Sequence, residues 1–155
     1  MIRYLVSGGK LASLAARCNR GMTALMYACK DGHKDVVQLL LELEHSALNV
    51  ELNARSNDGS TAFMWACAKG RKDVVQLLLV HSSKIELYAQ DVSGRTALMD
   101  ACDNGHKDIV QLLLNHSNKI QLKAKDINGR TPSDFALFNK HEDIVKLILK
   151  HSKEM

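Results

Sequence analysis

Histidine and cysteine are the residues of this chain that could bind a metal ion. The seven histidines and four cysteines recur at fixed positions of a longer pattern, which explains their spacing without a metal. No two histidines stand four residues apart beside a third donor, and no Cys-x-x-Cys pair occurs. Cys29, Cys67 and Cys102 share one apolar position, where cysteine behaves as a small hydrophobic residue. The sequence therefore predicts no metal site and no cofactor.

Two carboxylates could perform acid–base chemistry. Asp100 and Asp103 are three residues apart, so a helix would place both on one face. No nucleophile with a base and an orienting group stands near them, and carboxylates at this spacing are typical of a solvated helix face. The Ser-Gly-Gly-Lys run at residues 7–10 is too short for a phosphate-binding loop. We expect no catalytic residues and no enzymatic activity.

Charge and hydropathy argue against a membrane protein and leave nucleic-acid binding as a weak alternative. Lys34, Lys72 and Lys107 share one position and could follow phosphates, but each is followed by an aspartate that cancels most of its field. With a net charge of only +4, we expect no nucleic-acid partner. No apolar run reaches the ~20 residues that a membrane span needs. The first six residues are too short and polar for a signal peptide. We expect an intracellular, cytoplasmic monomer, with a nuclear location left open.

These residues recur because the chain repeats one unit. Glycines in a predicted turn fall at 21, 59, 94 and 129, and residues 59–93 match residues 94–128 at 21 of 35 positions. Self-similarity at this period indicates a solenoid, in which each unit is held by its neighbours. We expect a single domain over 1–155, with repeats at 18–55, 56–90, 91–125 and 126–155. Residues 1–17 are interpreted as a partial, capping repeat.

Each unit contains the signals for two helices. A threonine at 23, 61, 96 or 131 is a good N-cap, and Pro132 stands at the first helical position that proline favours. In the first unit the apolar residues predict helices over 24–29 and 36–41, separated by Gly32-His33 as a C-cap. Residues 85–87 and 120–122 alternate apolar and polar side chains, which predicts short extended segments.

The unit resembles the ankyrin repeat, a β-turn followed by two helices. Residues 96–101, Thr-Ala-Leu-Met-Asp-Ala, stand where that family has Thr-Pro-Leu-His-x-Ala. Gly105-His106 matches the helix break, and residues 109–114 match the second helix. The resemblance implies an all-α ankyrin-repeat solenoid. The family histidine is replaced by Met26, Met64, Met99 and Asp134, which exchanges a hydrogen bond for packing in three copies.

The resemblance also implies where a partner would bind. In ankyrin repeats the variable site of the first helix, here Tyr27, Trp65, Asp100 and Phe135, faces a concave groove, and the turn tips lie beside it. These positions vary while the core repeats, and Trp, Tyr and Arg are enriched at binding hot spots. The alternative is that the variable residues have no binding role and only cover the inner helices. The expected partner-binding residues are Arg20, Met22, Tyr27, Asp58, Trp65, Lys69, Ser93, Arg95, Asp100, Asp103, Asn128, Arg130 and Phe135.

The function implied is non-catalytic protein–protein interaction through this groove and the turn tips. Fold alone does not fix function, so a second hypothesis stays open. The chain could be a structural spacer, or a fragment of a larger ankyrin protein, with no ligand of its own. The sequence does not identify a partner.

Overall fold

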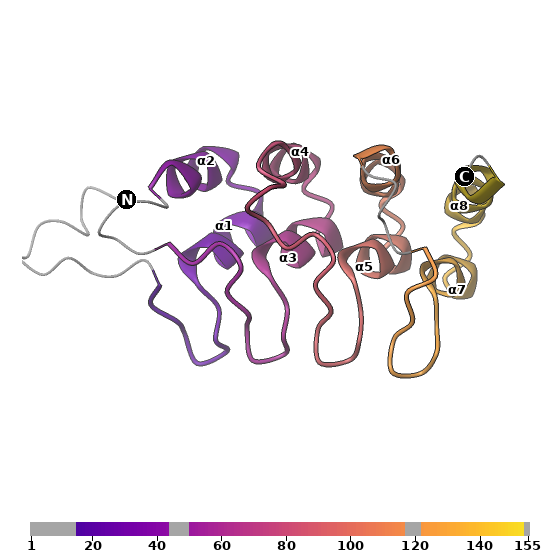
Figure 1. Ribbon diagram of the computed structural model, residues 1–155, viewed down its shortest axis with the longest axis horizontal. Helices are drawn as coiled ribbons and strands as arrows, with labels where there is room; N and C mark the ends of the chain where they lie inside the picture. The colour runs from indigo at the N-terminus through magenta and orange to yellow at the C-terminus, as the bar shows by residue number, and fades with distance from the viewer. Residues whose placement is uncertain (1–14, 44–49, 117–121, 154–155) are drawn as a thin grey trace, which may run out of the picture.

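The computed structural model describes residues 15–43, 50–116 and 122–153. In these ranges the chain forms four pairs of helices that stack side by side (Figure 1). The first helices of the pairs form one row, which we call the inner helices: α1 (Ala24–Asp31), α3 (Ala62–Ala68), α5 (Ala97–Asp103) and α7 (Pro132–Phe138). The second helices form a parallel row, the outer helices: α2 (Lys34–Glu42), α4 (Lys72–Val80), α6 (Lys107–His116) and α8 (Glu142–Lys153). The predicted all-α solenoid is confirmed.

Four loops project from the base of the inner helices, away from the outer row (Figure 1). We call them the fingers; their tips are the turns at Gly21, Gly59, Gly94 and Gly129, which all have positive φ. An isolated antiparallel bridge between Gln90 and Thr96 ties the base of the third finger.

The predicted threonine caps start every inner helix. Each Thr hydroxyl accepts a hydrogen bond from the backbone N–H three residues on, at 3.3 to 3.4 Å. The cap satisfies one of the backbone donors that a helix leaves open at its start. Two of the residues that replace the family histidine also form a hydrogen bond with the backbone N–H of the cap threonine. Met99 Sδ accepts from Thr96 N at 3.4 Å, and Asp134 Oδ2 accepts from Thr131 N at 2.7 Å.

Gly70 and Gly105 have a second role beside their left-handed backbone. An imidazole of the next repeat lies directly over each, so a Cβ at Gly105 would meet His141 at 2.6 Å. His141 Nε2 donates to the Asp103 carbonyl at 3.2 Å, and His106 makes the same bond to Ala68 at 3.1 Å. Arg71, which replaces the histidine once, donates from Nε to the Lys30 carbonyl at 2.9 Å. These periodic residues therefore join consecutive repeats.

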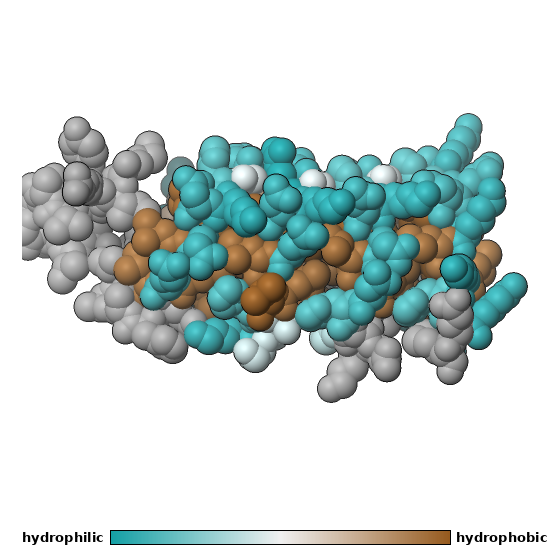
Figure 2. All heavy atoms as spheres, turned by 90° about the horizontal axis from the view of Figure 1, so that it is seen from above, coloured by the Kyte–Doolittle hydropathy of each residue, from teal (hydrophilic) through white to brown (hydrophobic). Residues whose placement is uncertain are grey.

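The core runs along the length of the stack as a continuous apolar band, visible between hydrophilic side chains in Figure 2. Cys29, Cys67 and Cys102 are fully buried in it, as predicted for small hydrophobic residues. Burial raises the pKa of Cys29 and Cys102 to about 12, so these thiols stay protonated and unreactive at neutral pH.

The prediction of an extended segment at residues 85–87 was wrong. The chain bends at Ile85 and turns at Leu87, and Asn53 of the preceding repeat binds it: Asn53 Nδ2 donates to the Lys84 carbonyl and Oδ1 accepts from Glu86 N, both at 2.8 Å. A side-chain amide thus supplies the bonds that a strand partner would have made. Residues 120–121 of the equivalent segment lie outside the described residues. So do residues 1–14 of the predicted capping repeat.

Candidate binding surface

The candidate residues meet where the inner helices join the fingers. In each repeat the variable residue stands four positions after the threonine cap, so it has the same place on each inner helix. The inner helices contact one another in order and form one row (Figure 1). The variable positions consequently form one line: Tyr27, Trp65, Asp100 and Phe135. We call this line and the adjoining finger residues the inner surface.

Hydrogen bonds between backbones hold the fingers at a fixed spacing. In each case a backbone N–H near the tip of one finger donates to a backbone carbonyl of the finger before it. The three bonds are Asn57 N to Arg20 O at 3.0 Å, Val92 N to Asp58 O at 3.0 Å, and Ile127 N to Ser93 O at 2.9 Å. Because these bonds use only the backbone, the tip side chains can vary without disturbing the arrangement.

In the C-terminal half, the inner surface is sealed by its own side chains. Arg95 pairs with Asp100 at 2.8 Å and with Asp103 at 2.7 Å, and its guanidinium carbon lies 4.4 Å from the centre of the Phe135 ring. Arg130 lies 4.5 Å from the same ring centre and pairs with the fully buried Asp126 carboxylate at 2.7 Å. Phe135 is left 3% exposed.

The Asp100–Asp103 pair is therefore held by an arginine and is not a free acid–base pair. Burial raises the pKa of Asp100 to about 6, and the opposing attraction of Arg95 limits the rise. Asp103 also accepts a hydrogen bond from Asn139 Nδ2 at 2.6 Å. The contacts of both carboxylates are those of a structural network that joins α5, α7 and the third finger.

The N-terminal half is more open. Tyr27 is 39% exposed and Trp65 is partly buried. Lys30 Nζ lies 5.7 Å from the centre of the Tyr27 ring and 5.8 Å from that of Trp65. The indole Nε1–H of Trp65 is buried and has no hydrogen-bond partner among the described residues. A buried donor without an acceptor costs free energy, so Trp65 is not optimised for the stability of the isolated chain.

Two other groups lie beside these aromatic rings. The Cys18 thiol is exposed and lies 3.5 Å from the Tyr27 hydroxyl, whose hydrogen bond is the main cause of a lowered Cys18 pKa. A hollow of about 200 Å³ opens between the first and second fingers, lined by Asn19, Arg20, Met22, Asp58 and Trp65 among others.

Most of the expected partner-binding residues have accessible surface. Arg20, Tyr27, Asp58, Lys69, Asn128 and Arg130 are exposed, and Trp65, Ser93, Arg95, Asp100 and Asp103 are partly exposed. Met22 and Phe135 are instead buried, at 2% and 3% exposure. Met22 packs into the core, and Phe135 is covered by the two arginines. Neither presents a surface to a partner in this conformation.

The expected set also misses two residues at one repeat position. Lys30 and Phe138 both stand three residues after the variable site, where the other repeats have Ala68 and Asp103. Lys30 lies against both N-terminal rings, and Phe138 is 85% exposed. The signal was present in the sequence, because this position varies between lysine, alanine, aspartate and phenylalanine inside nearly identical repeats.

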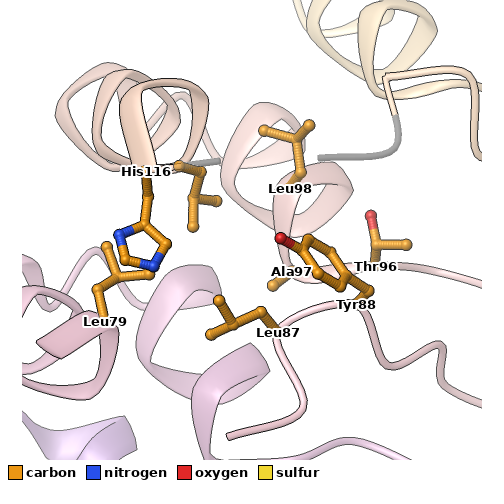
Figure 3. Close-up of a pocket in the computed structure, with 8 residues that line it drawn as sticks. Leu79, Leu87, Tyr88, Thr96, Ala97, Leu98 and His116 are labelled. Atoms are coloured by element: carbon orange, nitrogen blue, oxygen red, sulfur yellow. The ribbon is translucent and has the colours of Figure 1, made fainter. Parts of the chain in front are cut away.

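A second cavity lies deeper, between the second and third repeats (Figure 3). Leu79, Leu87, Leu98 and Leu113 line it together with the Tyr88 and His116 side chains. Its volume of about 20 Å³ is enough for about one water molecule. This cavity is a small packing gap and not a ligand pocket.

The described residues contain neither a cluster of metal ligands nor a membrane-spanning helix. No group of three His, Cys, Asp or Glu side chains comes together as metal ligands in residues 15–43, 50–116 and 122–153. Over those ranges, no helix is long and apolar enough to cross a membrane.

Comparison with known proteins identifies the family. A family model described as ankyrin repeats in three copies matches residues 1–91 and again residues 79–155. A search of curated proteins found no match. Ankyrin-repeat domains are generally protein-interaction modules and typically non-catalytic. The helix pairs, the threonine caps and a match over the whole length lead to one conclusion: this chain belongs to the ankyrin-repeat family.

Proposed function

We propose that the inner surface binds a protein partner and that the chain has no catalytic activity of its own. The observation that carries the proposal is the contrast between the two halves of this surface. The chain covers Phe135 with its own arginines but leaves Tyr27 and Trp65 accessible at the same repeat position. Tyrosine and tryptophan are the residue types that most often contribute binding energy at interfaces.

The orphaned Trp65 N–H supports the same proposal. An unsatisfied buried donor of this kind is expected where function, and not packing, selects the residue. The indole is also the only tryptophan in the chain. A partner that contacts this half would gain an aromatic anchor at the centre of a polar rim, which is the usual composition of an interface hot spot.

The charges on the outer helices argue against a nucleic-acid partner. Lys72 pairs with Asp108 of the next repeat at 3.1 Å, and Lys107 pairs with Asp143 at 3.3 Å. The recurring lysines thus alternate with carboxylates along the stack, and phosphates would meet no continuous positive field. We also propose an intracellular location, because all four cysteines are free thiols.

The spacer hypothesis has one observation in its favour. The network around Arg95 uses variable positions for internal contacts, as a purely structural array would. This network is confined to the third and fourth repeats, however, and no arginine covers Tyr27 or Trp65 at the same position of the first and second repeats in the part of the chain that the structure describes.

Affinity capture from a cell lysate tests the proposal. Wild-type protein is compared with the double variant Tyr27→Ala/Trp65→Ala and with a control, Leu39→Ala/Val80→Ala, which removes exposed apolar side chains from the outer helices. All three must have the same circular dichroism spectrum. We expect a protein that the wild type and the control retain and the inner-surface variant loses. Equal retention by all three would place the site elsewhere, and no retention by any would favour the spacer.

A further inference from the structure

The C-terminal half of the inner surface shows how this chain binds a guanidinium group. Arg95 and Arg130 each lie within about 4.5 Å of the centre of the Phe135 ring while pairing with a carboxylate. The contact combines the attraction between a cation and an aromatic face with a charged hydrogen bond. Both arginines directly follow the turn glycine of their finger.

Because the units repeat, the position equivalent to Phe135 can be identified two units earlier in the chain. Trp65 is the equivalent of Phe135, and the positions equivalent to Arg95 and Arg130 are occupied by Met22 and Ser60. Met22 is buried in the core and Ser60 is short, so neither covers the indole as the arginines cover Phe135. The hollow between the first and second fingers lies beside Trp65 at this place.

A carboxylate stands at the same hollow. Asp58 accepts hydrogen bonds from the Ser56 hydroxyl and, at 3.2 Å, from Ser60 N. Partial burial opposes ionisation, but these bonds outweigh it and hold the pKa of Asp58 below its usual range. Within the described residues no lysine or arginine forms an ion pair with Asp58, whereas Asp100, Asp103 and Asp126 each have an arginine.

Two cationic side chains, Lys30 and Arg20, lie near the hollow, but neither takes the position over Trp65 that the arginines take over Phe135. Lys30 is 5.8 Å from the Trp65 ring centre, near the outer limit of a favourable contact and well beyond the 4.4 Å of Arg95 over Phe135. Arg20 lines the hollow but precedes the turn glycine and is exposed. Its charge opposes an incoming cation, so the attraction must come from the indole face and Asp58.

We propose that this hollow binds an arginine side chain of the protein partner, with the guanidinium stacked on Trp65 and paired with Asp58. The inference rests on the proposed function and names the side chain that the N-terminal half of the inner surface recognises. Arginine fits better than lysine because its planar group can stack on the ring and donate to a carboxylate at the same time.

The single tryptophan provides the assay, since its indole N–H gives one resonance in a ¹H–¹⁵N spectrum. The full chain is titrated with N-acetyl-arginine amide, and separately with the lysine and glutamate analogues. The variant Ser60→Arg places in the hollow the residue that the third and fourth repeats already carry. Gln76→Arg, on the exposed side of α4, adds the same charge elsewhere. Asp58→Asn keeps an acceptor for Ser56 and Ser60 but removes the charge.

We expect the arginine probe to shift the indole resonance with saturation in the wild type and in Gln76→Arg, and to leave Ser60→Arg unchanged. Asp58→Asn is expected to weaken the probe's apparent affinity by roughly two- to fivefold, as for an exposed charge pair. Arg20→Ala should bind the arginine probe at least as well as the wild type. A response to the glutamate probe that Arg20→Ala abolishes would overturn the proposal, as would equal responses from wild type and Ser60→Arg.

The capture experiment and the arginine titration test the two proposals separately. If Tyr27→Ala/Trp65→Ala loses a partner but the arginine probe causes no shift, the arginine site is refuted and the proposed function stands. If the probe binds as expected but capture does not depend on the inner surface, the hollow binds a guanidinium and the proposed location of the partner is refuted.

Discussion

Replacing Asp100 by asparagine is expected to stabilise the protein at neutral pH. Burial raises the pKa of this carboxyl from its ordinary 3.8 to about 6, against the attraction of Arg95. The folded protein therefore binds the Asp100 proton more tightly than the unfolded chain does. The stabilising contribution of protonated Asp100 is complete below the unfolded pKa and is lost as the pH rises through about 6.

The size of this stabilisation follows from the folded and unfolded pKa values of Asp100. The difference between the folded and unfolded pKa corresponds to about 3 kcal/mol once the pH exceeds both. The Asp100 side chain is only 15% exposed, so solvent screens little of this cost. Asparagine is neutral and can still accept the Arg95 hydrogen bond, and the pKa of about 6 already includes the attraction of Arg95 for the ionised carboxylate. Asp100→Asn should therefore raise the free energy of unfolding by about 3 kcal/mol at pH 7.5 and by less than about 1 kcal/mol at pH 4.

Urea unfolding at several pH values between 4 and 7.5 measures this difference. Asp103→Asn is the matched control, because it removes a charge from the same network at a side chain that is 31% exposed. We expect this control to lose about 0.5 to 1 kcal/mol of stability at neutral pH. The reasoning is refuted if Asp100→Asn is less stable than the wild type at pH 7.5, or if its effect is the same at both ends of the pH range.

Three further predictions concern the core, the contacts between repeats and the exposed thiol. Leu113→Ala truncates a side chain that is 4% exposed and should cost about 2 to 5 kcal/mol in urea unfolding, whereas a cost below 1 kcal/mol would contradict its place in the core. Gly105→Ala should cost about 2 kcal/mol or more, since φ is +74° and the new Cβ would meet His141. The double variant Gly105→Ala/His141→Ala should recover part of that loss, and no recovery would mean that backbone strain is the whole effect. Native protein treated with iodoacetamide should acquire one adduct, at Cys18, by mass spectrometry, and modification of the three buried cysteines would show that the core opens readily.

Features that depend on local chemistry were predicted well from the sequence. The threonine caps, Pro132 at the start of α7 and the left-handed Gly32 each follow from the backbone needs of one helix end. The cysteines were placed correctly because a position that repeats in every unit must have the same surroundings in each.

Features that depend on a neighbouring repeat were not predicted. The burial of Phe135 requires two arginines that lie 40 and five positions before it, and no periodicity of apolar residues signals that contact. The bent segment at residues 85–87 is held by Asn53 of the previous unit, so an alternating pattern was misread as an extended segment. Histidine periodicity was recognised, but the bonds of His106 and His141 to the preceding repeat appear only in three dimensions. The partner-contacting residues stay a prediction.

The contacts between repeats also bear on how such a chain can change in length. Each contact of this kind pairs a glycine of one unit with a histidine or arginine of the next, and an equivalent backbone hydrogen bond joins each pair of neighbouring fingers. If the unit at 56–90 were removed, His106 would take the place of Arg71 over Gly32, and Val92 N would face the Arg20 carbonyl. The new junction would contain the same types of contact as the old ones. Gain or loss of a whole internal unit would therefore leave these types of contact intact, whereas a substitution such as Gly105→Ala disrupts one of them. The inner surface would be altered in one step, because Trp65 and Asp58 would leave together.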